Sequence, residues 1–158
     1  MKHKSVIIIA LAMVFTVVLS GYLIIRDRNN VDYYIQVNDC HIEKTSCQVT
    51  LDQSNTLQVN ISPKGIPASE RLTISVDAKG DKLDEVSVFF EAIEIDTSTP
   101  QYRLYKNGKN SFSGSGFLAI CTLSKQSWIA HLIVKRGSET WEISLPFKKQ
   151  LINTLIQR

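Results

Sequence analysis

The chain has 158 residues, 44% of them hydrophobic, and a formal net charge of +3 at pH 7. Its lysines and arginines are scattered, without the runs of about five or six like charges that mark a nucleic-acid-binding tail. Nucleic acid is therefore not an expected partner. The length suffices for one membrane segment and one domain with its own apolar core.

An apolar segment over residues 5–25 carries no charged side chain. As a helix rising about 1.5 Å per residue, it would span roughly 30 Å, the thickness of a bilayer core. The run is longer than the apolar region of a signal peptide, and no A-x-A-like cleavage site follows it, so we expect an uncleaved anchor over residues 1–28. A cleaved signal peptide is the alternative. Basic residues before the segment predict a short cytoplasmic tail and an exported C-terminal domain.

Residues 29–147 alternate between apolar and polar side chains, which is the period of a half-buried β-strand. The alternation is clearest at residues 56–62, 71–78, 85–92, 128–135 and 140–147, and further strands are expected at 32–37 and 112–121. Asn107-Gly108 is a strong signal for a tight hairpin. Seven to nine short antiparallel strands predict an all-β, immunoglobulin-like sandwich.

The predicted core includes Trp128 and Trp141, which share a face with the apolar residues of their strands. The last segment, residues 148–158, is expected to form a tail or a short amphipathic helix, which would be too short to be stable alone. The predicted order along the chain is therefore anchor, sandwich and tail.

The cysteines of an exported domain meet an oxidising compartment, where neighbouring thiols pair. Cys40 and Cys47 lie seven residues apart across a predicted turn, which favours a disulfide between them. Closing that loop of about eight residues would contribute roughly 2.5 kcal/mol to stability by chain entropy. The alternative pairs Cys121 with one of them across the sandwich, near a tryptophan as in immunoglobulin domains. Either pairing leaves one thiol unpaired.

A metal or thiol site is the chemical alternative to a structural disulfide. Thiolates combined with histidine or methionine suit Cu(I). The side chains available for it are Cys40, His41, Cys47, Cys121 and His131. The spacing is not C-x-x-C, and both methionines precede the predicted domain. We therefore expect no cofactor, and copper or thiol chemistry at Cys121, His41 and His131 is the alternative.

No catalytic residues are predicted. The G-x-S-x-G motif is absent, and the Gly-Ser-Gly at 114–116 falls inside a predicted strand rather than at the turn that exposes a nucleophile. His131 is expected to face outward, opposite Trp128 on its strand, with no evident acidic residue to orient it. The chain is therefore not expected to be an enzyme. The carboxylates at the end of the strand at 85–92 are expected to be solvated: Glu91, Glu94 and Asp96.

An aromatic-rich hairpin around Asn107-Gly108 is the candidate partner surface. Loops that cross from one sheet to another often carry the binding function of a sandwich. The residues that would form this surface are Tyr102, Tyr105 and Phe112. Aromatic cross-strand pairs within an ordinary hairpin are the alternative interpretation.

Several motifs occur in an order that resembles a family of small membrane-anchored proteins. They are the Cys40/Cys47 pair, ISPKGIP, VSVFFEAIEID, the stretch YRLYKNGKNSFSGSGFLAICTLSKQSWIAHLIV, and ISLPF. Over about residues 33–147 this order resembles the proteobacterial FixH and YtkA-like group of immunoglobulin-type domains. The group carries a methionine-rich segment where this chain has residues 92–96, and that departure weakens the case for copper. Cys121 and Trp128 match the group's C-terminal motif.

The resemblance implies a single span at residues 5–25 in the bacterial inner membrane, with the domain in the periplasm. Members of the group tend to be encoded near cytochrome oxidase or copper-delivery genes. We therefore expect a non-enzymatic accessory or assembly protein that contacts another membrane protein, in respiratory oxidase biogenesis. The alternatives are a copper-handling or thiol-redox protein using Cys121 with Cys40 or Cys47, and a structural subunit of an envelope complex.

Overall fold

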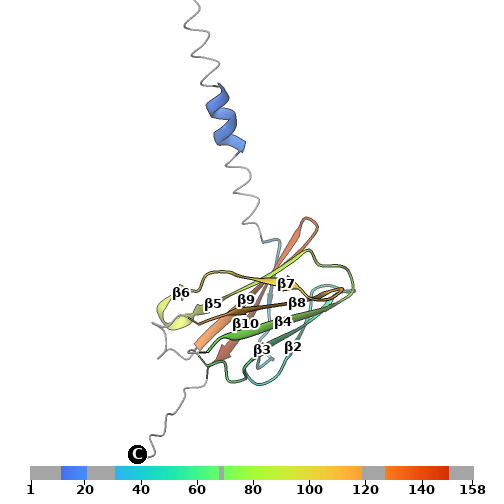
Figure 1. Cartoon of the computed structure of the whole chain (residues 1–158), viewed down its shortest axis with the longest axis vertical. Helices are drawn as coiled ribbons and strands as arrows, with labels where there is room; N and C mark the ends of the chain where they lie inside the picture. The colour runs from blue at the N-terminus through green and yellow to red at the C-terminus, as the bar shows by residue number, and fades with distance from the viewer. Residues whose placement is uncertain (1–11, 21–30, 68–69, 119–126, 150–158) are drawn as a thin grey trace, which may run out of the picture. The chain divides into compact units, whose positions relative to one another are not determined.

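A computed structural model of the chain describes residues 12–20, 31–67, 70–118 and 127–149. The chain divides into two compact units, Met1–Val31 and Asp32–Arg158. In the first unit, residues 12–20 form an α-helix (Figure 1). Among the described residues, no helix is long and apolar enough to cross a membrane. Much of the predicted anchor, and all of the predicted tail beyond residue 149, lie outside the described ranges.

The second unit is built from β-strands, so the all-β prediction is confirmed. In the described ranges the elements are β1 Tyr33–Gln36, β2 Cys47–Thr50, β3 Thr56–Ser62, β4 Leu72–Lys79, β5 Glu85–Ala92, the 3₁₀ turn η1 Ile93–Ile95, β6 Thr97–Ser98, β7 Tyr102–Lys106, β8 Ser111–Gly116, β9 Ser127–Arg136 and β10 Glu139–Lys148. They follow one hydrogen-bonded order, β1-β10-β9-β5-β7-β8-β4-β3-β2, with β6 paired to β5 (Figure 1). This continuous path forms one curled sheet, in which β7 pairs with a strand of each half.

One pair of strands departs from the expected antiparallel pattern. β1 runs parallel to β10, with Tyr33 opposite Trp141 and Ile35 opposite Ile143. A parallel pair needs a long connection, and here almost the whole second unit lies between the two strands. The alternation of side chains along β1 carries no information on direction, which is why the sequence did not indicate it.

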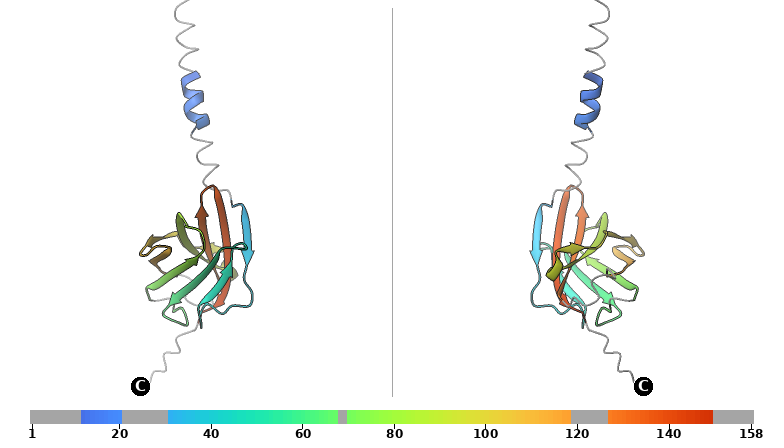
Figure 2. Two further views of the ribbon diagram at one scale, coloured as in Figure 1. Left: turned by 90° about the vertical axis from the view of Figure 1, so that its right-hand side faces the viewer. Right: turned by 90° about the vertical axis from the view of Figure 1, so that its left-hand side faces the viewer.

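β7 joins the two halves of the sheet. Its residues Tyr102 and Leu104 pair with β5, while Tyr105 pairs with β8. A Cβ atom on Gly114 of β8 would lie only 2.7 Å from Leu104 Cδ2, so a side chain there would push β7 away. The glycines of the Gly-Ser-Gly stretch therefore serve close strand packing. Figure 2 shows the curl of the sheet in two further views.

Both halves of the sheet contribute to one apolar core. In β3 and β4 the inward positions alternate with exposed or half-buried ones, as the period of two predicts. In β5, β9 and β10 some outward positions are buried as well, among them Ser87, His131 and Glu142. Trp128 and Trp141 are both buried in this core. The largest side chains removed from water are Trp128, Phe90, Ile42, Leu57, Ile61, Ile66, Leu72, Ile74, Leu83, Leu118, Leu132 and Ile143.

Arg136, at the end of β9, connects three turns. Its Nη1 lies 2.9 Å from Asp52 Oδ2 and 3.2 Å from Asp81 Oδ2, and its Nη2 lies 2.9 Å from Glu139 Oε2. The guanidinium also lies 4.8 Å from the centroid of the Trp141 ring. Asp52 precedes β3 and Asp81 precedes β5, so one side chain links the two halves of the sheet at this end of the β9–β10 hairpin.

The predicted disulfide between Cys40 and Cys47 is confirmed, with the two Cα atoms 5.7 Å apart. Cys47 is the first residue of β2, and Cys40 lies in the connection that follows β1. The bridge therefore joins the first residue of the edge strand β2 to the segment that follows the other edge strand, β1.

Replacing both bridged cysteines, Cys40→Ala with Cys47→Ala, is expected to lower the free energy of unfolding by about 2.5 kcal/mol, because the unfolded chain regains the entropy of the open loop. Urea denaturation of the second unit measures this loss. Adding reductant to the wild-type protein should reproduce it, and should leave the double variant unchanged. Equal midpoints for the two proteins without reductant would contradict a stabilising bridge.

Asp52 is expected to make the fold sensitive to acid. The Ser54 backbone N–H lowers the pKa of Asp52 most, the Asn55 side chain and Arg136 lower it further, and together they bring it from 3.8 to about 2. Because the folded-state pKa lies below the unfolded one, the ionised carboxylate stabilises the fold above about pH 4. That contribution is lost as the pH falls toward 2.

Urea midpoints measured between about pH 5 and pH 2 test this expectation. Asp52→Asn should flatten the fall in midpoint over the window in which wild type loses stability. Asp77→Asn, which removes an exposed carboxylate on β4, is the matched control and should keep the wild-type slope. Identical slopes for wild type and Asp52→Asn would show that Asp52 is not the group responsible.

Candidate functional site

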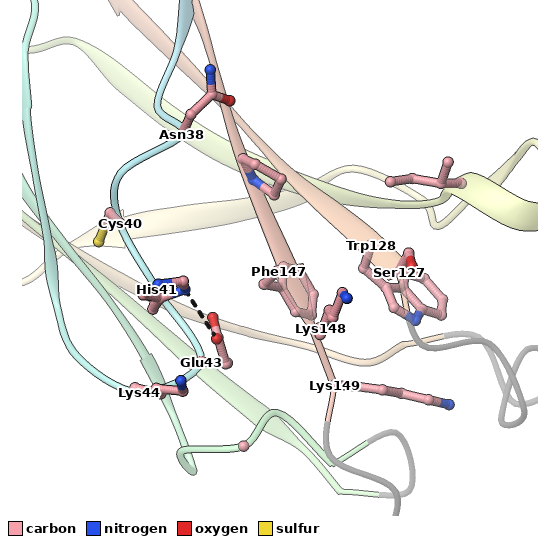
Figure 3. A pocket seen from close by; sticks show the side chains of 13 residues that line it. Asn38, Cys40, His41, Glu43, Lys44, Ser127, Trp128, Phe147, Lys148 and Lys149 are labelled. Carbon is pink, nitrogen blue, oxygen red and sulfur yellow. Dashed lines mark ion pairs between the residues drawn. The ribbon is translucent and has the colours of Figure 1, made fainter.

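A cavity of about 630 Å³ lies where β9 begins and β10 ends (Figure 3). This volume is within the range of pockets that bind small ligands or peptide side chains. The β1–β2 connection, the turn after β3, η1 and the two strand ends all contribute to its wall. The residues lining it are Asn38, Cys40, His41, Glu43, Lys44, Gly65, Ile93, Ser127, Trp128, Pro146, Phe147, Lys148 and Lys149.

The β1–β2 connection is held in shape by its own contacts. The backbone N–H groups of Lys44 and Thr45 donate to the His41 carbonyl at 2.8 and 2.9 Å, which closes a tight turn. Ile42 is fully buried in the core, and the Gly65 N–H donates to the Glu43 carbonyl at 2.7 Å. With the disulfide closing its base, this turn places the Glu43 side chain on the cavity wall.

Glu43 is the unusual group of this cavity. The residue is only 9% exposed, and its Oε1 lies 3.5 Å from His41 Nδ1 (Figure 3). Its Oε2 is buried and has no hydrogen-bond partner among the described residues. A buried acceptor left unpaired costs about 1–3 kcal/mol, and more when it is charged, so this oxygen is a strong site for an incoming donor.

The lysine that interacts with the charge of Glu43 is Lys64. Lys64 Nζ donates to the Ile42 and Thr45 carbonyls at 3.2 and 2.9 Å and to Asn60 Oδ1 at 2.7 Å. Burial lowers the pKa of Lys64, and the nearby charge of Glu43 opposes that shift. Lys64 therefore interacts with the charge of Glu43 while its own hydrogen bonds go to other acceptors. Glu43 Oε2 has no donor among the described residues.

Two more lysines, Lys148 and Lys149, line the cavity at the end of β10. Lys148 is exposed, whereas Lys149 is buried. Burial lowers the pKa of Lys149, and the charge of Glu94 opposes that shift. The cavity therefore combines one inward-facing acceptor with a mainly cationic rim, an arrangement suited to binding a ligand that brings its own hydrogen-bond donor.

His131 forms a second polar cluster, on the outward face of β9. Its Nδ1 lies 2.8 Å from Glu142 Oε1, and its Nε2 lies 2.8 Å from Glu91 Oε2. Ser144 Oγ lies 3.3 Å from Nδ1, and the Phe89 ring stacks on the imidazole at a centroid distance of 4.6 Å. Each ring nitrogen therefore has a carboxylate within hydrogen-bond distance, one from each neighbouring strand.

One expectation about His131 is confirmed and one is wrong. Its side chain lies on the face of β9 opposite Trp128, as predicted, although the residue is only 7% exposed. It also has two acidic partners, Glu91 on β5 and Glu142 on β10, and Glu91 is therefore not a freely solvated carboxylate. Strand register brings these groups together, and no spacing within one strand could have indicated it.

Tyr34 extends this cluster to the edge strand β1. A hydrogen bond to Glu142 is the main cause that raises the pKa of Tyr34 from 10.0 to about 12, with smaller effects from burial and from the charges of Glu142 and Glu91. The neutral phenol is thus favoured as a donor to the carboxylate. The cluster connects four strands, β1, β10, β9 and β5.

The predicted partner surface is wrong for Phe112. This side chain is 2% exposed and belongs to the core, because its position on β8 faces inward. Tyr102 is half-buried, and its hydroxyl donates to the Phe117 carbonyl at 3.0 Å. Tyr105 alone of the three predicted residues is well exposed, at 69%. The aromatic residues of this hairpin therefore do not form one surface.

The described residues proposed for a metal or thiol site do not form one cluster. The disulfide occupies both Cys40 and Cys47, and Cys121 lies outside the described ranges. His41 lines the cavity, whereas both nitrogens of His131 face carboxylates on the sheet. Within residues 12–20, 31–67, 70–118 and 127–149, no group of three or more His, Cys, Asp or Glu side chains is arranged to hold a metal ion.

Comparisons with known proteins do not identify a family. No protein-family model, curated protein or solved structure matches the chain. The resemblance to the FixH and YtkA-like group therefore rests on the order of the motifs alone.

Replacing His131 with leucine is expected to cost about 3–5 kcal/mol of unfolding free energy, because it leaves the Glu91 and Glu142 carboxylates without the ring nitrogens that contact them. The double variant His131→Leu/Glu142→Leu should recover part of this loss, since it also removes the more buried carboxylate. Urea denaturation of the single and double variants measures both effects as a double-mutant cycle.

His41→Leu is the matched control for this prediction. The His41 side chain is 68% exposed and has one long contact to Glu43, so its replacement should change stability by less than about 0.5 kcal/mol. Equal effects of the two histidine substitutions would show that the His131 cluster is not a stabilising network.

Proposed function

We propose that the chain is a membrane-tethered, extracytoplasmic binding domain that acts by contact with a partner and not by catalysis. The observation that carries the proposal is the Glu43 carboxylate, which lines an open cavity with one buried oxygen unpartnered among the described residues. A group that loses stability when unpaired and lies beside an opening is suited to receive a donor from outside.

The location in this proposal has two supports. Disulfides persist outside the cytosol, and Cys40 and Cys47 form one in the second unit. The uncharged run at residues 5–25 has the length of a membrane span, and basic residues before it favour a cytoplasmic N-terminus. In this proposal the second unit lies in the periplasm of a bacterium and residues 1–28 anchor it to the inner membrane.

The contacts of His41 and His131 favour binding over catalysis. A general acid or base needs a ring nitrogen that can exchange a proton with a substrate. Both nitrogens of His131 lie against carboxylates, and the ring is buried. His41 reaches only Glu43, at 3.5 Å. These contacts suit one structural cluster and one binding pocket.

The resemblance to the FixH and YtkA-like group supplies a more specific form of the proposal. In that form the chain is an accessory or assembly protein for a respiratory oxidase, and its partner lies in the same membrane. The curled sheet, with its halves on either side of β7, would then be a variant of the immunoglobulin-like sandwich of that group.

Photocrosslinking in the native membrane tests the binding function. A benzoylphenylalanine placed at Lys148, on the rim of the cavity, is expected to give a discrete crosslinked product with the full-length chain. Glu43→Gln in the same background should abolish that product, because the amide nitrogen replaces the oxygen that accepts the partner's donor.

The same photoreactive residue at Lys109, in the β7–β8 turn, is the positional control and should give no such product. Either of two results would overturn the proposed function. One is the same set of products from both positions. The other is a product from position 148 that persists unchanged in the Glu43→Gln background.

A further inference from the structure

We infer that the cavity around Glu43 receives an extended acidic peptide segment of the partner, with a backbone or side-chain amide N–H donating to the Glu43 carboxylate. This inference rests on the proposed binding function and names the chemistry of its ligand. It follows from the acceptor that the cavity presents, the charges around it and the edge strand that leads into it.

The ligand must bring a hydrogen-bond donor. Glu43 Oε2 is buried and unpartnered among the described residues, and Oε1 has only the distant His41 nitrogen. Lys64, whose pKa is affected by the charge of Glu43, donates instead to two backbone carbonyls and to Asn60 Oδ1. A donor from the ligand would therefore satisfy an acceptor that these neighbours leave open.

The surrounding charges argue against a cationic donor. Three lysines line the cavity, Lys44, Lys148 and Lys149, against the single carboxylate of Glu43. Glu94 lies near Lys149 and offsets part of that charge. A metal ion or an alkylammonium group would be repelled by this rim, whereas a neutral N–H would not. The same lysines favour a ligand whose remaining groups are negatively charged.

The neighbouring edge strand favours a peptide as the source of the N–H. β1 is the first strand in the sheet order, and in the described part of the chain it pairs only with β10. Asn38 and Cys40, which follow directly on β1, line the cavity. Tyr33 and Tyr34 on β1 are 48% and 70% exposed. An extended peptide that adds a strand beside β1 would continue into the cavity, because the chain that follows β1 forms part of the cavity wall.

A displayed peptide library tests the inference on the full-length chain. The chain is embedded in phosphatidylcholine nanodiscs and panned against random dodecapeptides, with empty nanodiscs as the background. Enriched peptides are expected to be rich in Asp and Glu. The most enriched peptide is then synthesised with a fluorescein label, and its affinity is measured by fluorescence anisotropy.

Three variants distinguish binding of the peptide in the cavity from nonspecific electrostatic attraction to the chain. Glu43→Gln is expected to weaken binding of the synthetic peptide by about tenfold or more, since one unmade charged hydrogen bond is of that size. Lys148→Gln should weaken it about threefold and reduce its salt dependence. Glu70→Gln, which removes an exposed carboxylate outside the cavity lining, should stay within about twofold of wild type.

A thermal-unfolding scan of each variant guards against misfolding. Glu43→Gln should melt no lower than wild type, because it replaces a buried charge by a neutral group of the same shape. Lys148→Gln alters an exposed side chain and gives an independent test should Glu43→Gln prove unstable.

Several outcomes would overturn the inference. In the panning, these are enrichment of basic or uncharged peptides, or no enrichment over empty nanodiscs. In the affinity measurement, it is peptide binding that Glu43→Gln does not weaken. Glu43-dependent binding of a sulfated tetrasaccharide in place of peptides would also contradict the inference. If the crosslink at position 148 still depends on Glu43 in these cases, the proposed binding function is supported and only the assignment of an acidic peptide as the ligand is wrong. Loss of that dependence removes the proposed function as well.

Discussion

Apolar side chains line one face of almost every strand of the second unit, and that face must leave water before any site can form. The sheet buries it by curling, so that strands on either side of β7 share one core. The curl depends on close packing of β7 on β8, where Gly114 leaves room for Leu104. Arg136 then joins the turns of both halves at one end. The Arg136 cluster, which draws on turns from both halves, therefore depends on this curl.

The charged groups of the unit differ in how well they are paired. Arg136 lies against three carboxylates, and His131 lies between Glu91 and Glu142. In each case donors and acceptors match, which is what allows charge to leave bulk water at a tolerable cost. Glu43 is nearly as buried as His131, yet one of its oxygens has no donor among the described residues. We therefore assign His131 to the stability of the fold and propose Glu43 as the group that binds a partner.

Strand positions could be predicted from the sequence because a period of two follows directly from one buried face. The segments at 56–62, 85–92 and 140–147 all lie in strands, and the short loop between Cys40 and Cys47 indicated their pairing. The neighbours of each strand could not be predicted in this way. The carboxylates beside His131 come from other strands, and the direction of β1 is set by a distant partner. The turn that carries Glu43 is fixed in part by Gly65, which lies far from it in the sequence.

The disulfide also decides how mechanical tension passes through the chain. A pull on the segment before β1 would first strip its short pairing with β10 and straighten residues 32–40, a length of roughly 30 Å at about 3.4 Å per residue. The load would then cross from Cys40 to Cys47 through the covalent bond and enter β2. Residues 41–46 lie outside that path. A tethered domain under strain would thus keep its His41–Glu43 turn relaxed while its first strand yields.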